Sequence, residues 1–129
     1  MNVVGFDHLV LTVRDLAATC RFYVEGLGLR HERFGEGRHA LRLGAQKINL
    51  HEAGREFEPR AAHPVPGSAD FCLLTEEALE TVGARMAALG HPVLLGPVRR
   101  TGAAGPILSL YFRDPDGNLV EVARPLEQG

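Results

Sequence analysis

Histidine and carboxylate side chains occur in segments of the sequence that are otherwise apolar. His8, His51 and Glu121 each alternate with aliphatic residues, and imidazole and carboxylate groups are the donors that suit Zn, Fe, Ni or Mn. A carboxylate within an aliphatic strand should be paired or metal-bound if it is buried, which makes Glu121 the strongest candidate. A lone histidine in a strand is more often a hydrogen-bonded structural residue. A metal site therefore requires the fold to bring these side chains together.

The alternation of side chains along each expected strand assigns the polar residues to one face. The opposite, uniformly apolar faces can bury two amphipathic helices. The polar faces share a small set of residues: His8, Asn49, His51, Asp70, Tyr111 and Glu121. This set predicts a polar pocket enclosed by a curved sheet. Asp70 stands near the start of its strand, so a turn-capping role is an open alternative for it.

Two arginines offer a second kind of chemistry. Arg99 and Arg100 lie among the small residues of segment 96–105, which we expect to be a flexible loop. Arginine pairs well with carboxylate and phosphate oxygens, so both are candidates to clamp a substrate anion. Two solvated surface arginines are the alternative interpretation. The cysteines, Cys20 and Cys72, lack metal-binding spacing and are expected to be small buried hydrophobic residues.

An internal repeat organises the elements that must position these residues. Segment 8–13 aligns with segment 70–75, Asp15 with Glu77, and 27–28 with 89–90. In the first half, alternation and glycine-bearing turns predict strands at 6–13, 29–34, 38–43 and 47–52. Asp15 is expected to cap a short helix that ends near Gly26 and Gly28. The first half therefore reads βαβββ.

The second half repeats this order after a proline-bearing arm. We expect a helix over 79–89, and the expected strands are 70–75, 92–95, 106–113 and 118–124. Asp-Pro-Asp-Gly at 114–117 is a strong turn signal between the last two strands. The fold class is therefore α+β, with two tandem βαβββ modules that form a cupped mixed sheet with the helices outside. Residues 1–129 are expected to form one domain, divided into module 5–53, arm 54–68 and module 69–125.

Composition and charge exclude several classes of protein. The chain has 129 residues, 45% of them hydrophobic, and 14 Lys and Arg balance 16 Asp and Glu. This describes one ordinary globular domain without a basic face for nucleic acid. No apolar run approaches the roughly 18 residues that a membrane span needs, and Met1 leads directly into strand-like sequence rather than a leader. We therefore expect a cytoplasmic protein with no membrane or nucleic-acid partner.

Three segments together resemble the vicinal oxygen chelate superfamily, which includes glyoxalase I, extradiol dioxygenases, fosfomycin-resistance enzymes and bleomycin-binding proteins. These are the opening strand FDHLVLTV at 6–13, FRDPDGN at 112–118, and LVEV at 119–122. The resemblance extends over essentially the whole chain. Within the superfamily, segments 46–51 and 96–102 are most similar to the glyoxalase domain-containing protein 5 type.

The resemblance implies one divalent metal ion per chain (Zn, Ni, Mn or Fe), with ligands from the first and last strands of each module. His8 and Glu121 match the ligand positions. Glyoxalase I and the dioxygenases have histidine where this chain has Asp70, and the glutamate of glyoxalase I aligns with Asn49. Because imidazole binds a divalent metal better than a carboxamide does, the expected ligands are His8, His51 and Glu121. Asn49 is assigned to substrate binding.

The function implied is a metal-dependent lyase or isomerase of the glyoxalase type, whose substrate chelates the metal through vicinal oxygens. Glu121 or Asp70 is expected to move the proton, and Tyr111, Arg99 and Arg100 to contact the small-molecule substrate. A non-haem Fe(II) extradiol-type dioxygenase and a metal-free binding or resistance protein are the alternatives. We also expect a homodimer, because open sheet edges are normally paired or covered.

Overall fold

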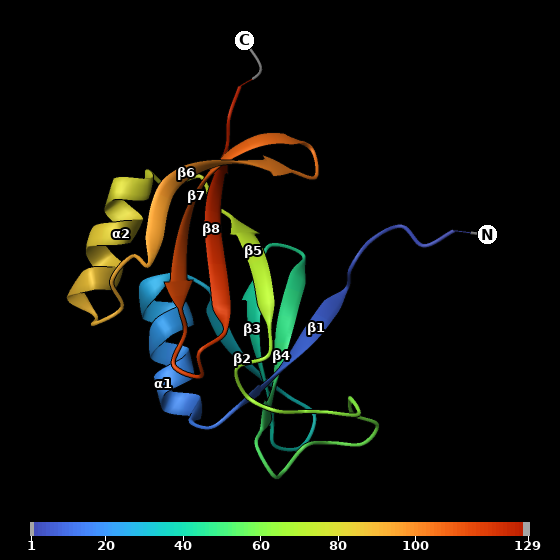
Figure 1. The fold of residues 1–129 in the computed structure, drawn as a ribbon. Coiled ribbons are helices and arrows are strands. Elements are labelled where there is room, and N and C mark those ends of the chain that lie inside the picture. Colours follow the sequence, from blue (N-terminus) through green and yellow to red (C-terminus); the bar gives the residue numbers. More distant parts are fainter. Residues whose placement is uncertain (1, 128–129) are drawn as a thin grey trace. The chain divides into compact units, whose positions relative to one another are not determined.

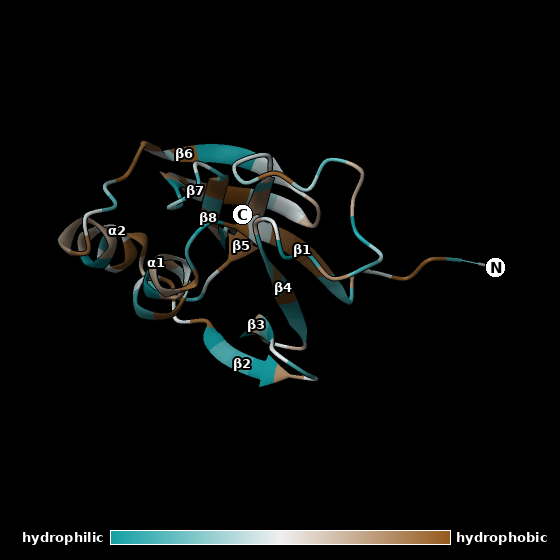
Figure 2. Ribbon diagram, turned by 90° about the horizontal axis from the view of Figure 1, so that it is seen from below, coloured by the Kyte–Doolittle hydropathy of each residue, from teal (hydrophilic) through white to brown (hydrophobic). Residues whose placement is uncertain are grey.

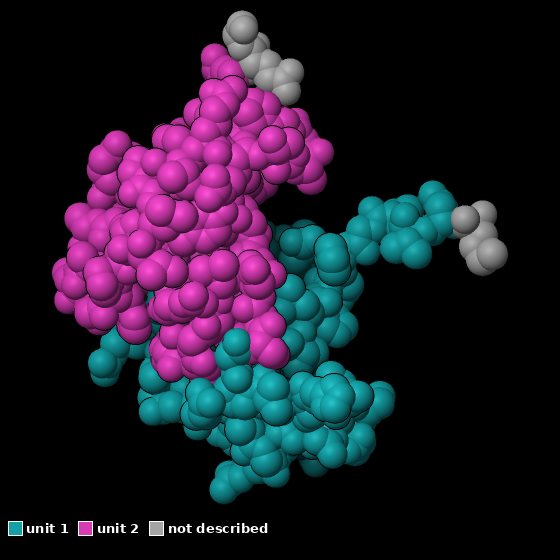
Figure 3. Space-filling view, in the orientation of Figure 1, with its two compact units in different colours: residues 1–67 teal, residues 68–129 magenta. Residues whose placement is uncertain are grey.

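The computed structural model describes residues 2–127 and divides the chain between Gly67 and Ser68 into two compact units (Figure 3). Unit 1 comprises Met1–Gly67 and unit 2 comprises Ser68–Gly129. Each unit holds one four-stranded mixed sheet and one helical segment in the order βαβββ. The predicted α+β class and the two tandem modules are confirmed, and the expected modules 5–53 and 69–125 fall within separate units.

Unit 1 contains a sheet in the order β1-β4-β3-β2, in which β1 runs parallel to β4 and the other neighbours are antiparallel (Figure 1). Its strands are β1 (His8–Val13), β2 (Arg30–Phe34), β3 (Arg38–Leu43) and β4 (Gln46–Glu52). Asp15 caps helix α1 (Leu16–Cys20), as predicted, by accepting a hydrogen bond from the amide of Ala18. The chain continues as the π-helical segment η1 (Arg21–Gly26), in which Phe22 and Tyr23 are buried.

Unit 2 repeats this topology in the order β5-β8-β7-β6, with β5 parallel to β8. Its elements are β5 (Asp70–Leu74), α2 (Leu79–Ala88), β6 (Leu95–Gly102), β7 (Gly105–Arg113) and β8 (Leu119–Pro125). Helix α2 packs on β7 and buries Leu79, Val82 and Met86, the periodic apolar residues that predicted it. Within residues 2–127, no helix has the length and apolarity that crossing a membrane requires.

Strand β6 differs from the sequence-based expectation. Segment 96–105 is not a flexible loop, because residues up to Gly102 pair with β7 in an antiparallel ladder that closes in a tight turn over 103–104. The expected strand over 92–95 is likewise wrong except for its last residue, Leu95. Gly96 and Pro97 are residues typical of loops, so the sequence does not predict a strand there. The pairing register with β7 shifts between Leu95 and Val98, at these two residues. Figure 2 shows a hydrophilic stretch over the middle of β6, where Arg99 and Arg100 lie.

The segment between β7 and β8 forms a buried hydrogen-bonded loop. Asp114 accepts hydrogen bonds at Oδ1 from the amides of Asp116 and Asn118, both at 2.9 Å, and at Oδ2 from Asn118 Nδ2 at 2.8 Å. Asn118 Oδ1 in turn accepts the amide of Ala69, just before β5, at 2.8 Å. Asp114 and Asn118 are 4% and 1% exposed. The Asp-Pro-Asp-Gly-Asn motif therefore has a structural role: it fixes the start of β5 beside the start of β8.

Candidate functional site

The strand register of unit 1 shows which residues share the polar face of its sheet. Val10 stands opposite Asn49 on β4, and Ala40 stands opposite Asn49 on β3. Side chains two residues apart on a strand point to the same face. His8 is two residues from Val10 and His51 is two residues from Asn49, so three members of the predicted pocket share this face. The sequence prediction of a shared face is consistent with this register.

His8, the first residue of β1, is held by its neighbour in sequence. Its Nδ1 lies 2.8 Å from Asp7 Oδ2, and the His8 side chain is 43% exposed. The ion pair lowers the pKa of Asp7, through the hydrogen bond and then the charge of His8. A carboxylate on one ring nitrogen fixes the imidazole tautomer and leaves Nε2 available, which is the usual arrangement of a metal-binding histidine.

The two histidines of unit 1 are not at the same level of the sheet. His8 pairs with Lys47, whereas His51 pairs with Thr12, four residues further along both strands. At about 3.3 Å per residue the two positions are about 13 Å apart along the strands. Side chains on one sheet face stand roughly side by side, and a metal ion binds imidazole nitrogen at about 2.0–2.1 Å. Unit 1 does not bring His8 and His51 together.

Of the candidate ligands Asn49 and His51, Asn49 is closer in register to His8, whose direct partner on β4 is Lys47. Asn49 lies two residues beyond the level of His8, about 8 Å away when both the strand spacing and the rise per residue are counted. Its Oδ1 is buried and accepts no hydrogen bond from the described residues. A buried carbonyl-type oxygen without a donor is unfavourable by about 1–3 kcal/mol, so a cation at this position would remove a defect that the protein otherwise carries.

Unit 2 presents Glu121 at the centre of its corresponding face. Glu121 on β8 pairs with Cys72 on β5 and with Tyr111 on β7. The hydroxyl of Ser109, which is fully buried, donates a 2.5 Å hydrogen bond to Glu121 Oε2. Asp70 is exposed and lies opposite Leu119, two residues from the level of Glu121. The Ser109 bond orients the carboxylate through Oε2.

The registers of the two units identify equivalent positions. Val10 pairs with Asn49 in unit 1, and Cys72 pairs with Glu121 in unit 2. Because 8–13 aligns with 70–75, Asn49 is the counterpart of Glu121, and His8 is the counterpart of Asp70. His51 pairs with Thr12 in unit 1, and the equivalent pair in unit 2 is Ala123 with Leu74. The counterpart of His51 is therefore Ala123. Within the internal repeat, the central position of the last strand is Asn49, not His51.

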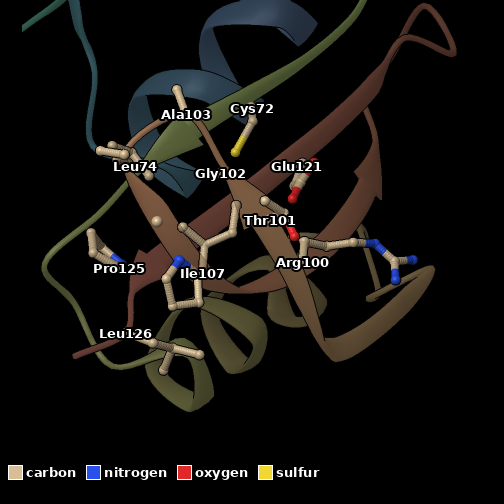
Figure 4. Close-up of a pocket in the computed structure, with 13 residues that line it drawn as sticks. Cys72, Leu74, Arg100, Thr101, Gly102, Ala103, Ile107, Glu121, Pro125 and Leu126 are labelled. Atoms are coloured by element: carbon tan, nitrogen blue, oxygen red, sulfur yellow. The ribbon is translucent and has the colours of Figure 1, made fainter. Parts of the chain in front are cut away.

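A cavity of about 530 Å³ lies within unit 2 at this face (Figure 4). Its wall combines Glu121 and Cys72 from the sheet with the β6–β7 hairpin, including Arg100 and Thr101. The remaining lining is small or apolar: Leu74, Gly102, Ala103, Ala104, Gly105, Pro106, Ile107, Pro125 and Leu126. This volume suits a small organic ligand, and the carboxylate of Glu121 is the principal acidic group in its wall.

The structure separates the two arginines that the sequence placed together. Arg100 pairs with Ile107 and lines the cavity, whereas Arg99 pairs with Leu108, whose side chain points to the other face. Arg100 Nε donates to the hydroxyl of Tyr111 at 3.0 Å, and its guanidinium lies 5.5 Å from the Tyr111 ring centroid. Arg100 is therefore positioned by Tyr111 where it lines the cavity, and Arg99 does not join them.

Cys72 corrects a further expectation. It is exposed rather than buried in the core, and it lines the cavity. Partial desolvation, and secondarily the charge and hydrogen bonding of Glu121, raise the pKa of the Cys72 thiol to about 11. Sequence reasoning also assigned no role to Ser109, although the alternation places it on the same face of β7 as Tyr111.

Among residues 2–127, no three side chains of His, Cys, Asp or Glu are grouped closely enough to hold a metal ion. The donors are distributed: unit 1 presents His8 and the orphaned oxygen of Asn49, and unit 2 presents Glu121 and Asp70. Within unit 1, an imidazole and a carboxamide oxygen are donors that suit a borderline divalent ion, and within unit 2 the carboxylates suit a hard one.

Comparison with known proteins identifies the family. Residues 5–122 match the Glyoxalase/Bleomycin resistance protein/Dioxygenase superfamily. The chain belongs to this superfamily. Membership agrees with the two βαβββ modules and with the polar strand faces described above. The narrower likeness to the glyoxalase domain-containing protein 5 type is not tested by these matches.

Relatives within the superfamily cover nearly the whole chain. Virulence protein STM3117 of Salmonella typhimurium is 52% identical over 124 residues, which span 96% of this chain and 86% of that protein. Its crystal structure superposes with a TM-score of 0.93 over 98% of this chain and 100% of that one, at 49% identity. Glyoxalase domain-containing protein RDO1 of Mycosarcoma maydis is 48% identical over 123 residues, 95% of this chain and 69% of that protein.

An enzyme of defined reaction also shares the fold. Lactoylglutathione lyase from Agrobacterium tumefaciens matches with a TM-score of 0.70 and 25% identity, over 95% of this chain and 95% of that one. This similarity is one of fold.

Proposed function

We propose that this protein is a divalent-metal-dependent lyase or isomerase of the glyoxalase type. Its substrate is a small molecule that binds the metal through two neighbouring oxygens. The observation that carries the proposal is the equivalence of Asn49 and Glu121, each at the centre of a repeated sheet face. One of them has a buried oxygen without a donor, and the other has a carboxylate oriented by Ser109.

We assign the role of metal ligand to His8 and Asn49 on the sheet of unit 1 and to Glu121 on the sheet of unit 2, for one ion per chain whose ligands come from one chain or from two copies. His8 would bind through Nε2, because Asp7 occupies Nδ1. Asn49 takes the place first given to His51, since the register separates His51 from His8 by four residues. When bound, a divalent ion supplies Lewis acidity that stabilises negative charge on the substrate oxygens.

Proton transfer is assigned to the carboxylates of unit 2. Ser109 donates to Glu121 Oε2, so Oε1 is the atom that would accept a proton from a substrate carbon. A carboxylate held in a fixed orientation within reach of the substrate is a suitable general base. Asp70, two residues from this level on the neighbouring strand, is the second candidate for this role.

The unit 2 cavity is the proposed substrate site. Its volume of about 530 Å³ and its small, largely apolar wall favour a compact ligand over a bulky one. Arg100, held by its hydrogen bond to the Tyr111 hydroxyl, supplies a fixed donor in the wall. A hydrophobic wall also excludes water, which strengthens the interactions of Glu121 with a bound substrate.

Metal analysis tests the ligand assignment. Protein purified without chelator should contain one divalent ion per chain by elemental analysis, and His8→Ala and Glu121→Gln should each abolish stoichiometric metal. His51→Ala is the matched control and should retain the ion, because His51 stands at the level of Thr12. Full occupancy in the His8 and Glu121 variants, or equal loss in His51→Ala, would contradict the assignment. Circular dichroism should show that all three variants fold.

Oxygen consumption separates this proposal from the dioxygenase alternative. A lyase or isomerase should turn over anaerobically with Ni, Mn or Zn, because its metal acts without redox change. Stoichiometric oxygen uptake with a catechol and Fe(II) would replace the proposal with an extradiol-type reaction.

A further inference from the structure

The polar face of unit 1 carries two cations that have no acidic partner. Arg38 and Lys47 are only partly exposed, and neither forms an ion pair within the described chain. The carboxylates nearby bond to other side chains: Asp7 to His8 at 2.8 Å, Glu32 to Arg42 at 2.8 Å, and Glu56 to Arg60 at 3.2 Å. Arg38 and Lys47 therefore have no direct acidic partner among the described residues.

Aromatic rings fix the positions of these two cations. The Lys47 ammonium lies 3.7 Å from the centroid of the Phe34 ring. The Arg38 guanidinium lies 4.4 Å from the Phe57 ring and 6.0 Å from the Phe34 ring. Such contacts contribute about 0.5–1 kcal/mol each at accessible sites, and they hold long side chains that would otherwise move freely. The two positive groups are thus positioned over one region of the sheet.

The arm after β4 completes this region. Phe57 belongs to the expected arm 54–68, and its ring packs edge-on against His51 with centroids 5.7 Å apart. Half-buried His51 carries an imidazole N–H that donates in either protonation state. The group of Phe34, Arg38, Lys47, His51 and Phe57, which we call the basic face, is built entirely from unit 1. It combines two positioned cations, a further donor and an apolar border.

We propose that the basic face binds an oxyanion group of a small molecule, a carboxylate or a phosphate, through Arg38, Lys47 and His51. An oxyanion supplies the negative charge that the two cations lack, and charge-assisted hydrogen bonds from guanidinium and ammonium are stronger than neutral ones. Phe34 and Phe57 would contact the apolar part of the same ligand.

This inference names a ligand class for unit 1, a small anion. It goes beyond the proposed function, which assigns the substrate to the cavity of unit 2. The binding of an oxyanion by the basic face itself requires no metal ion, so the two proposals can fail separately.

Calorimetric titration of the metal-free protein tests the inference. Malonate and inorganic phosphate are the probes, at constant ionic strength set by chloride. One of them should bind saturably at one anion per chain, and which one binds distinguishes a carboxylate from a phosphate site. Arg38→Gln and Lys47→Gln should each weaken binding about 10-fold or more, about 1.4 kcal/mol. Arg38→Lys, which keeps the charge, should recover part of this loss.

The matched control is Arg33→Gln on β2. Arg33 pairs with His39 and therefore points to the opposite face of the sheet, so this variant should bind the probe within twofold of wild type. Absence of saturable binding by both probes, or equal weakening in the Arg33 and Arg38 variants, would overturn the inference. Because no metal is present, these results are independent of the metal analysis above.

Discussion

Cys72 and Glu121 lie opposite each other on neighbouring strands, and their coupling gives a measurable pH dependence. Partial burial and the nearby carboxylate raise the pKa of the Cys72 thiol to about 11 from 9.0. In the metal-free protein, the rate of iodoacetamide alkylation should therefore rise with pH to a midpoint near 11. Since the thiol keeps its proton longer in the folded chain, the folded state is favoured below pH 9, and this contribution is lost as the pH rises through 11.

The variant Glu121→Gln separates the causes of this shift. It removes the charge that disfavours the thiolate but keeps the desolvation, so the midpoint should fall without reaching the ordinary value. Alkylation at pH 8 should then be faster than in wild type, with Cys20 replaced by Ala in both proteins to leave one thiol. An unchanged midpoint would show that Glu121 does not act on Cys72.

For individual site residues, the sequence could predict which face of the sheet each side chain is on, but not its position along the sheet relative to residues on neighbouring strands. Alternation along a strand is local, so it correctly grouped His8, Asn49 and His51. The level of a residue depends on which partner it meets across the sheet, and that is set by strand register. For this reason the choice between Asn49 and His51 required the pairings of β1 with β4.

Among the elements, the buried loop between β7 and β8 makes a strong stability prediction. Asn118→Ala removes the acceptor of the Ala69 amide and the donor to Asp114. It also leaves buried groups without partners. The free energy of unfolding should fall by about 2–3 kcal/mol, measured by urea denaturation.

Arg113→Ala is the control for this loop. Its guanidinium is exposed and donates a long hydrogen bond to the carbonyl of Gly117, at 3.4 Å, so its effect should stay within about 0.5 kcal/mol. Equal stability losses in the two variants would remove the structural role assigned to Asn118.

Strand β6 gives a second prediction at this scale. Gly96 has φ of 121°, and a Cβ there would lie 2.5 Å from the carbonyl oxygen of Ser109. Gly96→Ala should therefore destabilise unit 2 by about 3 kcal/mol or more and disturb the strand that carries Ser109. Gly83→Ala in α2 is the matched control, because its Cβ would make ordinary contacts, the nearest at 3.5 Å. It should be neutral or stabilising by up to about 1 kcal/mol. A mild effect of Gly96→Ala in thermal unfolding would contradict this interpretation.

Gly96 also illustrates which elements could be predicted from the sequence and which could not. Helix α2 and strands β1, β3 and β7 follow from periodicity and lie close to their expected bounds. Strand β6 does not, because Gly96-Pro97 reads as a loop signal and only the ladder with β7 shows that it continues to Gly102. Long-range pairing overrode local propensity there.

At the scale of the whole molecule, the segment before β1 predicts self-association. Val3, Val4 and Phe6 are 94%, 91% and 81% exposed. Contiguous exposed apolar residues of this kind mark interaction sites. In a two-fold dimer, the segment of each chain would be buried at the shared interface. Burial of one such apolar side chain stabilises the dimer by about 1.5–3 kcal/mol. We therefore expect a homodimer in which the segment before β1 is covered.

The double variant Val4→Asp/Phe6→Asp should shift the protein to a monomer, because two carboxylates would have to be desolvated at the interface. Light scattering should give twice 14.0 kDa for wild type and 14.0 kDa for the variant. Leu94→Asp is the control, since Leu94 is an exposed apolar residue of unit 2 at 53%, and this variant should remain dimeric. A wild-type mass of 14.0 kDa at micromolar concentration would reject the dimer, whereas a monomeric Leu94 variant would move the interface away from the segment before β1.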